Sequence, residues 1–179
     1  MVIRIQKIFF SISILFCLSG YGQTNQTQKT DSLIKKLRKE FQAINSDTTL
    51  KTILLEGDEF MEQATDGGGE LSGYFKNKSL VKIVEQVGIS HGNRTREFYF
   101  KDNKLFFVFS KFESFMQTNN GLDLSKVKTS FEGRYYFSNE KLVMKKTTGE
   151  NSLGAEPLNG KELVDLAKEN SKLLSKKKP

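Results

Sequence analysis

The sequence of 179 residues has a single cysteine, Cys17, and a single histidine, His91. Cys17 lies in an apolar run near the amino terminus, so a chain that loses this run has no disulfide and no thiolate nucleophile. One histidine without cysteine also argues against zinc, which needs several nitrogen or sulfur ligands. Walker loops, dinucleotide fingerprints and G-x-S-x-G elbows are absent. We therefore expect no catalytic histidine, no cofactor and no metal site.

The first 22 residues have the composition of a secretory signal. Its charged start, apolar run and small residues at the cleavage positions are Arg4 and Lys7, Ile8 to Leu18, and Gly20-Tyr-Gly22. We expect the mature chain to begin at Gln23 and to be periplasmic or secreted. In the alternative interpretation, Cys17 is the lipidated residue of a lipoprotein, although the bulky Phe16 precedes it. The apolar run is shorter than a transmembrane helix requires.

The charge of the chain is positive but dispersed. The full sequence carries a formal charge of +7, and loss of Arg4 and Lys7 with the signal leaves +5. This charge favours solubility and a mild attraction to anionic surfaces. The lysines are scattered, and neither an arginine-rich helix nor a nucleic-acid motif is present, so nucleic acid is not an expected partner. The expected partner is an unidentified protein or small ligand.

The strongest internal pattern is a segment that occurs three times. Its shared form is aromatic, Phe, Lys or Ser, Asn or Asp, any residue, Lys or Ser, Leu, apolar. The copies are Gly73-Tyr-Phe-Lys-Asn-Lys-Ser-Leu-Val-Lys-Ile83, Phe98-Tyr-Phe-Lys-Asp-Asn-Lys-Leu-Phe-Phe-Val108 and Tyr135-Tyr-Phe-Ser-Asn-Glu-Lys-Leu-Val-Met-Lys145. Strand-forming residues flank a short polar interruption that suits a turn, so each copy predicts an antiparallel hairpin. The expected closing pairs are Phe75 with Leu80, Phe100 with Leu105, and Phe137 with Leu142.

Strict alternation along these strands sorts their side chains onto two faces. One face is nearly all apolar and must be covered; it includes Leu71, Phe75, Leu80, Phe98, Phe100, Leu105, Phe107, Phe109, Phe131, Tyr135, Phe137, Leu142 and Met144. The other face mixes aromatic and charged residues, and Ile83, Glu85, Val108 and Lys145 fall on it. Tyrosine and arginine dominate interfaces when they cluster, so the candidate binding residues there are Tyr74, Tyr99, Phe106, Arg134 and Tyr136. A solvated sheet face has the same composition, and this interpretation stays open.

These elements predict a single α+β domain over residues 31–175, preceded by a polar, flexible tether at residues 23–30. The sheet is an antiparallel meander of about six or seven strands. Its hairpins lie at 70–87, 94–115 and 128–146, and Lys51 to Glu56 adds a short strand. Helices from Asp31 to about Ile44 and from Asn159 to about Leu174 are expected to cover one face. Residues 117–126 are expected to form a longer loop.

The segment from Gly57 to Glu70 is irregular and acidic. Its carboxylates around Gly67-Gly-Gly69 are Asp58, Glu59, Glu62, Asp66 and Glu70. Their spacing does not match an EF-hand loop, so a solvated turn is expected, with a hard-cation site as the alternative.

Three functions remain compatible with the sequence. The first is an exported, non-enzymatic binding or inhibitor-like module that acts through the tyrosine and arginine face. The second is a carboxylate-only hydrolase that uses Asp58, Glu59, Asp66 or Glu70. The third is a carrier of an apolar ligand in a cavity lined by Phe98, Phe107 and Phe131.

The hairpin segments resemble the MORN-variant repeats of bacterial proteins, whose hairpins have the form Gly-x-Tyr-x-Asn-Gly-x-Leu. Gly73-Tyr-Phe-Lys-Asn-Lys-Ser-Leu80 and Gly133-Arg-Tyr-Tyr-Phe-Ser-Asn-Glu-Lys-Leu142 carry the resemblance. The sequence departs from that form at the turn glycine, which is replaced by Lys78, Asn103 and Glu140. The chain is also similar to small exported proteins of Bacteroidota. The resemblance covers residues 70–146 and implies a scaffold or interaction role.

Overall fold

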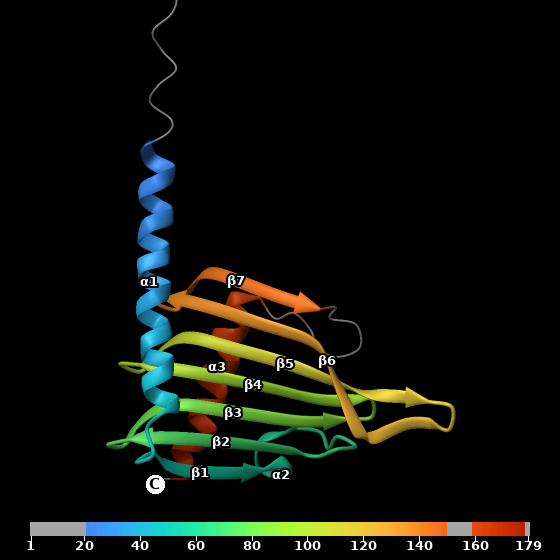
Figure 1. Ribbon diagram of the computed structural model, residues 1–179. Helices are drawn as coiled ribbons and strands as arrows, with labels where there is room; N and C mark the ends of the chain where they lie inside the picture. The colour runs from blue at the N-terminus through green and yellow to red at the C-terminus, as the bar shows by residue number, and fades with distance from the viewer. Residues whose placement is uncertain (1–20, 150–158, 178–179) are drawn as a thin grey trace, which may run out of the picture.

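The computed structural model describes residues 21–149 and 159–177, and it contains one seven-stranded antiparallel sheet. The strands follow one another in sequence order, so each pairs only with its neighbours in the chain (Figure 1). The elements are α1 (Tyr21–Asn45), β1 (Lys51–Glu56), α2 (Gly57–Phe60), β2 (Gly69–Lys76), β3 (Ser79–Ile89), β4 (Gly92–Lys101), β5 (Lys104–Thr118), β6 (Gly121–Ser138), β7 (Lys141–Gly149) and α3 (Gly160–Lys176). The expected α+β fold, a meander with amino- and carboxyl-terminal helices, is confirmed.

Parts of the sequence-based scheme lie outside the described residues. These are the first twenty residues, which hold most of the expected signal and Cys17, and the loop at residues 150–158. Within the described part of the chain, no helix is long and apolar enough to cross a membrane.

The three predicted hairpins close through the same kind of two-residue turn. Both central residues have positive φ in each: Asn77 and Lys78, Asp102 and Asn103, Asn139 and Glu140. Such turns match the twist of antiparallel strands, and asparagine and aspartate adopt the left-handed conformation more readily than most residues. The expected pairs of Phe75 with Leu80, Phe100 with Leu105 and Phe137 with Leu142 are all formed.

A β-bulge follows each of these turns at the equivalent position. In each outgoing strand, the residue directly after the closing leucine has no partner on the incoming strand. These residues are Val81, Phe106 and Val143. An extra residue reverses the alternation of every side chain that follows it. Phe107, Phe109 and Met144 therefore lie on the opposite face from the one that strict alternation predicts.

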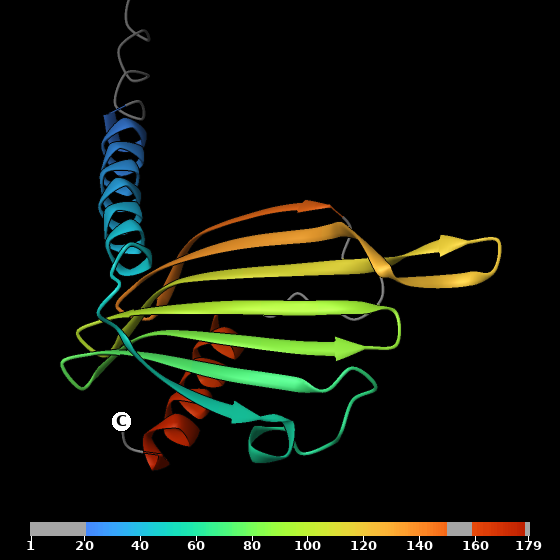
Figure 2. The same cartoon turned by 60° about the horizontal axis from the view of Figure 1, so that its bottom comes forward.

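The bulges place apolar side chains on both faces of the sheet, and one helix covers each face (Figure 2). The core beneath α3 consists of Ile53, Leu55, Leu71, Phe75, Ile83, Phe98, Phe100, Leu105, Val108, Tyr135 and Phe137, with Leu163, Val164, Ala167 and Leu174 of the helix. The core beneath α1 consists of Tyr99, Phe106, Phe107 and Tyr136, with Ile34 and Leu37 of the helix. The expectation that both helices cover a single face is therefore corrected to one helix on each face.

A buried polar cluster connects α3 to the middle of the sheet. The Glu85 carboxylate accepts hydrogen bonds from Arg96 Nη1 at 3.3 Å and Arg94 Nη2 at 3.5 Å. Its second oxygen accepts one from Asn170 Nδ2 of α3 at 3.1 Å. Burial lowers the pKa of Arg96, and the Glu85 charge acts in the opposite direction. Glu85 lies on the α3 face, not on the mixed face predicted for it, because it follows the bulge at Val81.

Two boundaries differ from the prediction. Helix α1 begins at Tyr21, so the expected tether at residues 23–30 is helical and Asp31 is an interior residue. Residues 23–31 contain no glycine or proline, and extending a helix that is already anchored costs little.

Residues 117–126 form a tight hairpin and not a long loop, because β5 continues to Thr118 and β6 starts at Gly121. The cap predicted at Asn159 is present, as its side chain accepts from the backbone of Glu162 at 3.1 Å.

Candidate binding surfaces

Helix α1 covers most of the predicted tyrosine and arginine face. Tyr99, Phe106 and Tyr136 are buried beneath the helix, whereas Tyr74 and Arg134 are partly exposed at the margin of the covered area. The five residues share a sheet face, as the sequence predicts. The three tyrosines precede the bulges of their hairpins, Phe106 is a bulge residue itself, and Arg134 lies two residues before Tyr136 on the same strand. Only Tyr74 and Arg134 remain accessible enough to touch a partner.

Tyr99 anchors the carboxyl-terminal end of α1. Its hydroxyl donates to the Glu97 carboxylate and lies 3.1 Å from the side-chain amide of Asn45, the last residue of the helix. Burial and the hydrogen bond to Glu97 raise the pKa of Tyr99 well above its usual range. Lys82 completes the network, with its Nζ atom 3.2 Å from Glu97 Oε2. The chemistry of this cluster is therefore structural: it holds the helix on the sheet.

Arg134 lines a groove of about 510 Å³ between α1 and the strands β4 to β6. Its guanidinium lies 5.2 Å from the ring centroid of Phe109 and 3.0 Å from Glu132 Oε2. The helix contributes Leu37 and Phe41 to the groove. The groove is thus mainly apolar, with Arg38, Glu97 and Arg134 as its charged lining residues, and Arg134 already has an acidic partner.

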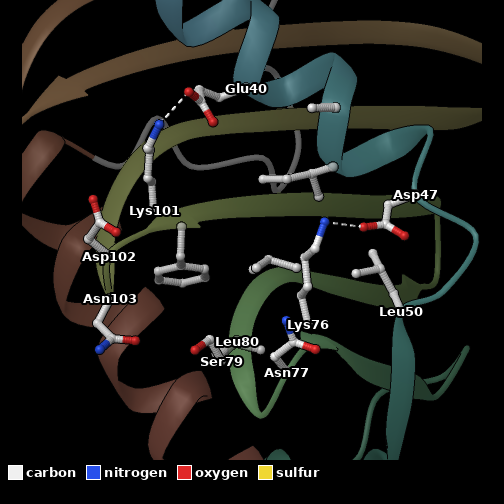
Figure 3. Close-up of a pocket in the computed structure, with 14 residues that line it drawn as sticks. Glu40, Asp47, Leu50, Lys76, Asn77, Ser79, Leu80, Lys101, Asp102 and Asn103 are labelled. Carbon is white, nitrogen blue, oxygen red and sulfur yellow. Dashed lines mark hydrogen bonds and ion pairs between the residues drawn. The ribbon is translucent and has the colours of Figure 1, made fainter.

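A second groove, of about 630 Å³, lies where the end of α1 meets the hairpin turns (Figure 3). Lys76 Nζ contacts Asp47 Oδ2 at 2.7 Å, and Lys101 forms an ion pair with Glu40 of α1. The hydrogen bond from Lys76 holds the pKa of Asp47 below its usual range. The four charges form two ion pairs that connect α1 and the segment after it to the hairpin turns. None of these four charged groups is therefore left without a partner to bind a ligand.

The outer part of the β5–β6 hairpin forms an arm, which we define as Phe115–Lys128. The arm begins beyond Ser114, the last residue of β5 to pair with β4. Its residues pair with each other, apart from Lys128, which pairs with Ser114, and the Phe115 backbone N–H also donates to the His91 carbonyl at 3.0 Å. It projects past the ends of the other strands (Figures 1 and 2). Four of the seven large apolar side chains that are exposed in the described residues belong to it: Met116, Leu122, Leu124 and Val127.

A local loop-out of β6 displays Leu124 at the surface of the arm. Asp123 pairs with Met116 and Val127 pairs with Phe115, which leaves the three residues between them outside the ladder. Asp123 fixes this excursion, because its Oδ1 accepts hydrogen bonds from the Ser125 backbone at 3.0 Å and hydroxyl at 2.6 Å. These bonds hold the pKa of Asp123 below its usual range. Leu124 is 65% exposed as a result, more than any other large apolar residue of the described chain.

The acidic segment after β1 has a structural role in this fold. Asp58, Glu59, Asp66 and Glu70 are all exposed. Glu59 accepts from the backbone of Glu56 and pairs with Lys177, which lowers its pKa. General acid catalysis by a carboxyl group needs the opposite shift. Among the described residues, no three His, Cys, Asp or Glu side chains gather closely enough to hold a metal ion.

The remaining sequence-based candidates are also separated by the fold. His91 lies in the turn between β3 and β4, where its ring packs 5.7 Å from that of Phe112. Phe98, Phe107 and Phe131 belong to three different core clusters, so they do not line a common cavity. The cavity expected for an apolar-ligand carrier is therefore not formed by these residues.

Sequence reasoning missed the arm, although a signal for it exists. Asn119-Asn-Gly121 is a turn sequence, and leucine alternates with polar residues in Leu122-Asp-Leu-Ser-Lys126. The alternation indicates a strand rather than a loop. The exposure of the leucines could not be deduced in the same way, because it depends on where the neighbouring strand β4 stops.

Comparisons with known proteins identify no relative: no family model, no curated protein and no solved structure matches the chain.

Proposed function

We propose that the protein is an exported, non-enzymatic binding module that attaches to another protein through its arm. The observation that carries this proposal is the concentration of exposed apolar side chains on a hairpin that no third strand supports. Monomeric proteins rarely expose clustered apolar surface without using it, because its removal from water is favourable. An isolated two-stranded hairpin is also marginally stable in water, so a partner that packs against it adds order.

The display of Leu124 favours a protein pocket as the occupant. Asp123 and Ser125 hold the loop-out in one conformation, which reduces the entropy lost when Leu124 enters a pocket. A membrane surface is less suited to this arm, because its charges are mixed: Asp123 pairs with Lys126 at 3.2 Å. Attraction to anionic lipid depends on clustered unpaired cations.

The experiment is a paired capture from the periplasm or culture medium of the native cells, with the mature chain as bait. The test variant is Leu122→Ser with Leu124→Ser, and the control is Leu54→Ser on β1. Leu54 is 46% exposed and Leu122 44%, so the control matches one of the two leucines that the arm variant replaces. We expect a partner that is retained by wild type and control and lost by the arm variant. The free energy of unfolding of each variant should lie within about 0.5 kcal/mol of the wild-type value, as expected for exposed substitutions.

Two results would contradict the role of the arm. One is a partner that the arm variant retains as strongly as wild type. The other is flotation of the mature protein with lipid vesicles that depends on Leu122 and Leu124, which would make the arm a membrane anchor instead.

Export is the second component of the proposal and has its own test. The charged start, apolar run and small residues before Gln23 support cleavage at that position. Amino-terminal sequencing of protein from the periplasm or medium should begin at or near Gln23. Intact protein that retains Met1 and stays in the cytoplasm would disprove export.

A further inference from the structure

The last strand of the sheet leaves a long edge without a partner strand. β7 runs for nine residues beside β6, and no strand in the described part of the chain pairs with its other side. All its residues except Met144 are exposed. An edge strand directs alternate backbone N–H and C=O groups outward, where they form a template for a further strand.

The charge of β7 is one-sided. The strand carries Lys141, Lys145 and Lys146 and no acidic residue. Lys145 lies 5.5 Å from the ring centroid of Tyr135, and none of the three lysines forms an ion pair with a described residue. Two described acids close to β7 in the sheet or the chain are already engaged, since Glu132 pairs with Arg134 at 3.0 Å and Glu140 with Lys168 at 3.3 Å. The edge therefore presents uncompensated positive charge.

The opposite edge of the sheet provides an internal comparison. β1 carries one basic residue, Lys51, and one acidic residue, Glu56, over its six residues.

Lysines on an edge strand also oppose self-association, because an antiparallel pair of β7 strands from two copies would contain six lysines and no acid. The charge thus excludes a second copy of this chain and selects a partner of the opposite sign.

We propose that the free edge of β7 binds an extended acidic segment of another protein, which adds to the sheet as a further antiparallel or parallel strand. Lys141 and Lys146, which share the α1 face with Met144, would pair with acidic side chains of that segment. Leu142, 39% exposed on the opposite face, offers an apolar contact to the residues that alternate with the acids. The ligand class is therefore an extended peptide in which acidic and apolar residues alternate. This inference concerns a different surface from the arm and does not depend on it.

The test uses the mature full-length chain and a labelled peptide of about six residues in which glutamate and valine alternate. A second peptide has lysine in place of glutamate, and a third carries backbone N-methyl groups on alternate residues. Binding is measured by fluorescence anisotropy. The site variant is Lys141→Glu with Lys145→Glu and Lys146→Glu. The matched control is Lys35→Glu with Lys36→Glu and Lys39→Glu, which changes net charge equally on the exposed side of α1.

We expect the acidic peptide to bind wild type and the α1 variant alike, and to bind the β7 variant at least about tenfold more weakly. The lysine peptide should not bind. N-methylation on the side facing β7 should abolish binding, and the acidic peptide should slow hydrogen exchange at β7 amides.

Three outcomes would overturn the inference. The acidic peptide could fail to bind at about 1 mM, the β7 and α1 variants could bind it equally, or the methylated peptide could bind as well as the unmodified one. The last result would show charge attraction without strand addition. A double Leu122→Ser and Leu124→Ser variant that still binds the peptide would separate this site from the arm.

Discussion

Replacement of Glu85 by alanine should lower the free energy of unfolding by about 3–5 kcal/mol. Glu85 is 4% exposed, and its carboxylate is the shared acceptor for Arg94, Arg96 and Asn170. Its loss leaves the Arg96 guanidinium, 7% exposed, next to a second cation without a counter-charge. A buried charge without a partner costs far more than the ion pair itself contributes, because the desolvation is no longer offset.

Two variants make this expectation specific. Glu132→Ala removes the partner of Arg134, whose side chain is 41% exposed, and should cost less than about 1 kcal/mol. Glu85→Leu combined with Arg96→Leu removes both buried charges and should recover most of the stability lost in the single variant. Urea unfolding followed by circular dichroism measures all three. A loss below about 1 kcal/mol for Glu85→Ala would mean that the guanidinium groups reach solvent.

Replacement of Phe107 by alanine should also cost about 3–5 kcal/mol, as expected for a large-to-small change in a core. Phe107 is 6% exposed and lies between the sheet and α1. Its ring centroid is 5.3 Å from that of Phe41 on the helix and 4.9 Å from that of Tyr136 on β6. The substitution removes the side chain that links these two layers, so α1 should loosen before α3 does.

Hydrogen exchange distinguishes this mechanism from a general loss of stability. In the Phe107→Ala variant, α1 amides should exchange faster while α3 amides keep their protection, since α3 packs on the other face. Phe98→Ala should give the reverse pattern, because Phe98 belongs to the α3 core. Lys104→Ala, at an exposed strand end, should cost less than about 0.5 kcal/mol in urea melts. Equal exchange of both helices in both variants would contradict the two-layer assignment.

Phe107 also marks the limit of prediction from the sequence. The hairpins, their closing pairs and both helices could be predicted, because turn chemistry and hydrophobic periodicity are local properties. The bulge residues Val81, Phe106 and Val143 carry no local signal, since an apolar residue in a strand looks the same whether or not it is paired. One extra residue in each hairpin then moved Phe107 and Met144 to the α1 face and Ile83, Val108 and Lys145 to the α3 face.

The candidate surfaces follow the same division. The sequence placed Tyr74, Tyr99 and Tyr136 on one face correctly, because each precedes the bulge in its hairpin. The sequence could not show that α1 covers Tyr99 and Tyr136. The sheet face on which a helix packs depends on where the folded sheet presents an apolar surface. The arm and the β7 edge escaped prediction for a related reason. The arm is defined by where β4 ends, and the β7 edge by the lack of a further strand beside it in the described residues; both are properties of the whole sheet.

The strand order has a consequence for how the chain reaches this fold. Because each strand pairs only with its sequence neighbours, the sheet can assemble hairpin by hairpin, with short loop closures at every step. The helices contribute the distant contacts, such as Asn45 with Tyr99, 54 residues apart, and Asn170 with Glu85, 85 residues apart. We therefore expect the docking of the two helices on the sheet to require the longest loop closures of the fold. A sheet without its helices would expose an apolar face on each side, and exposed surface of this kind favours aggregation.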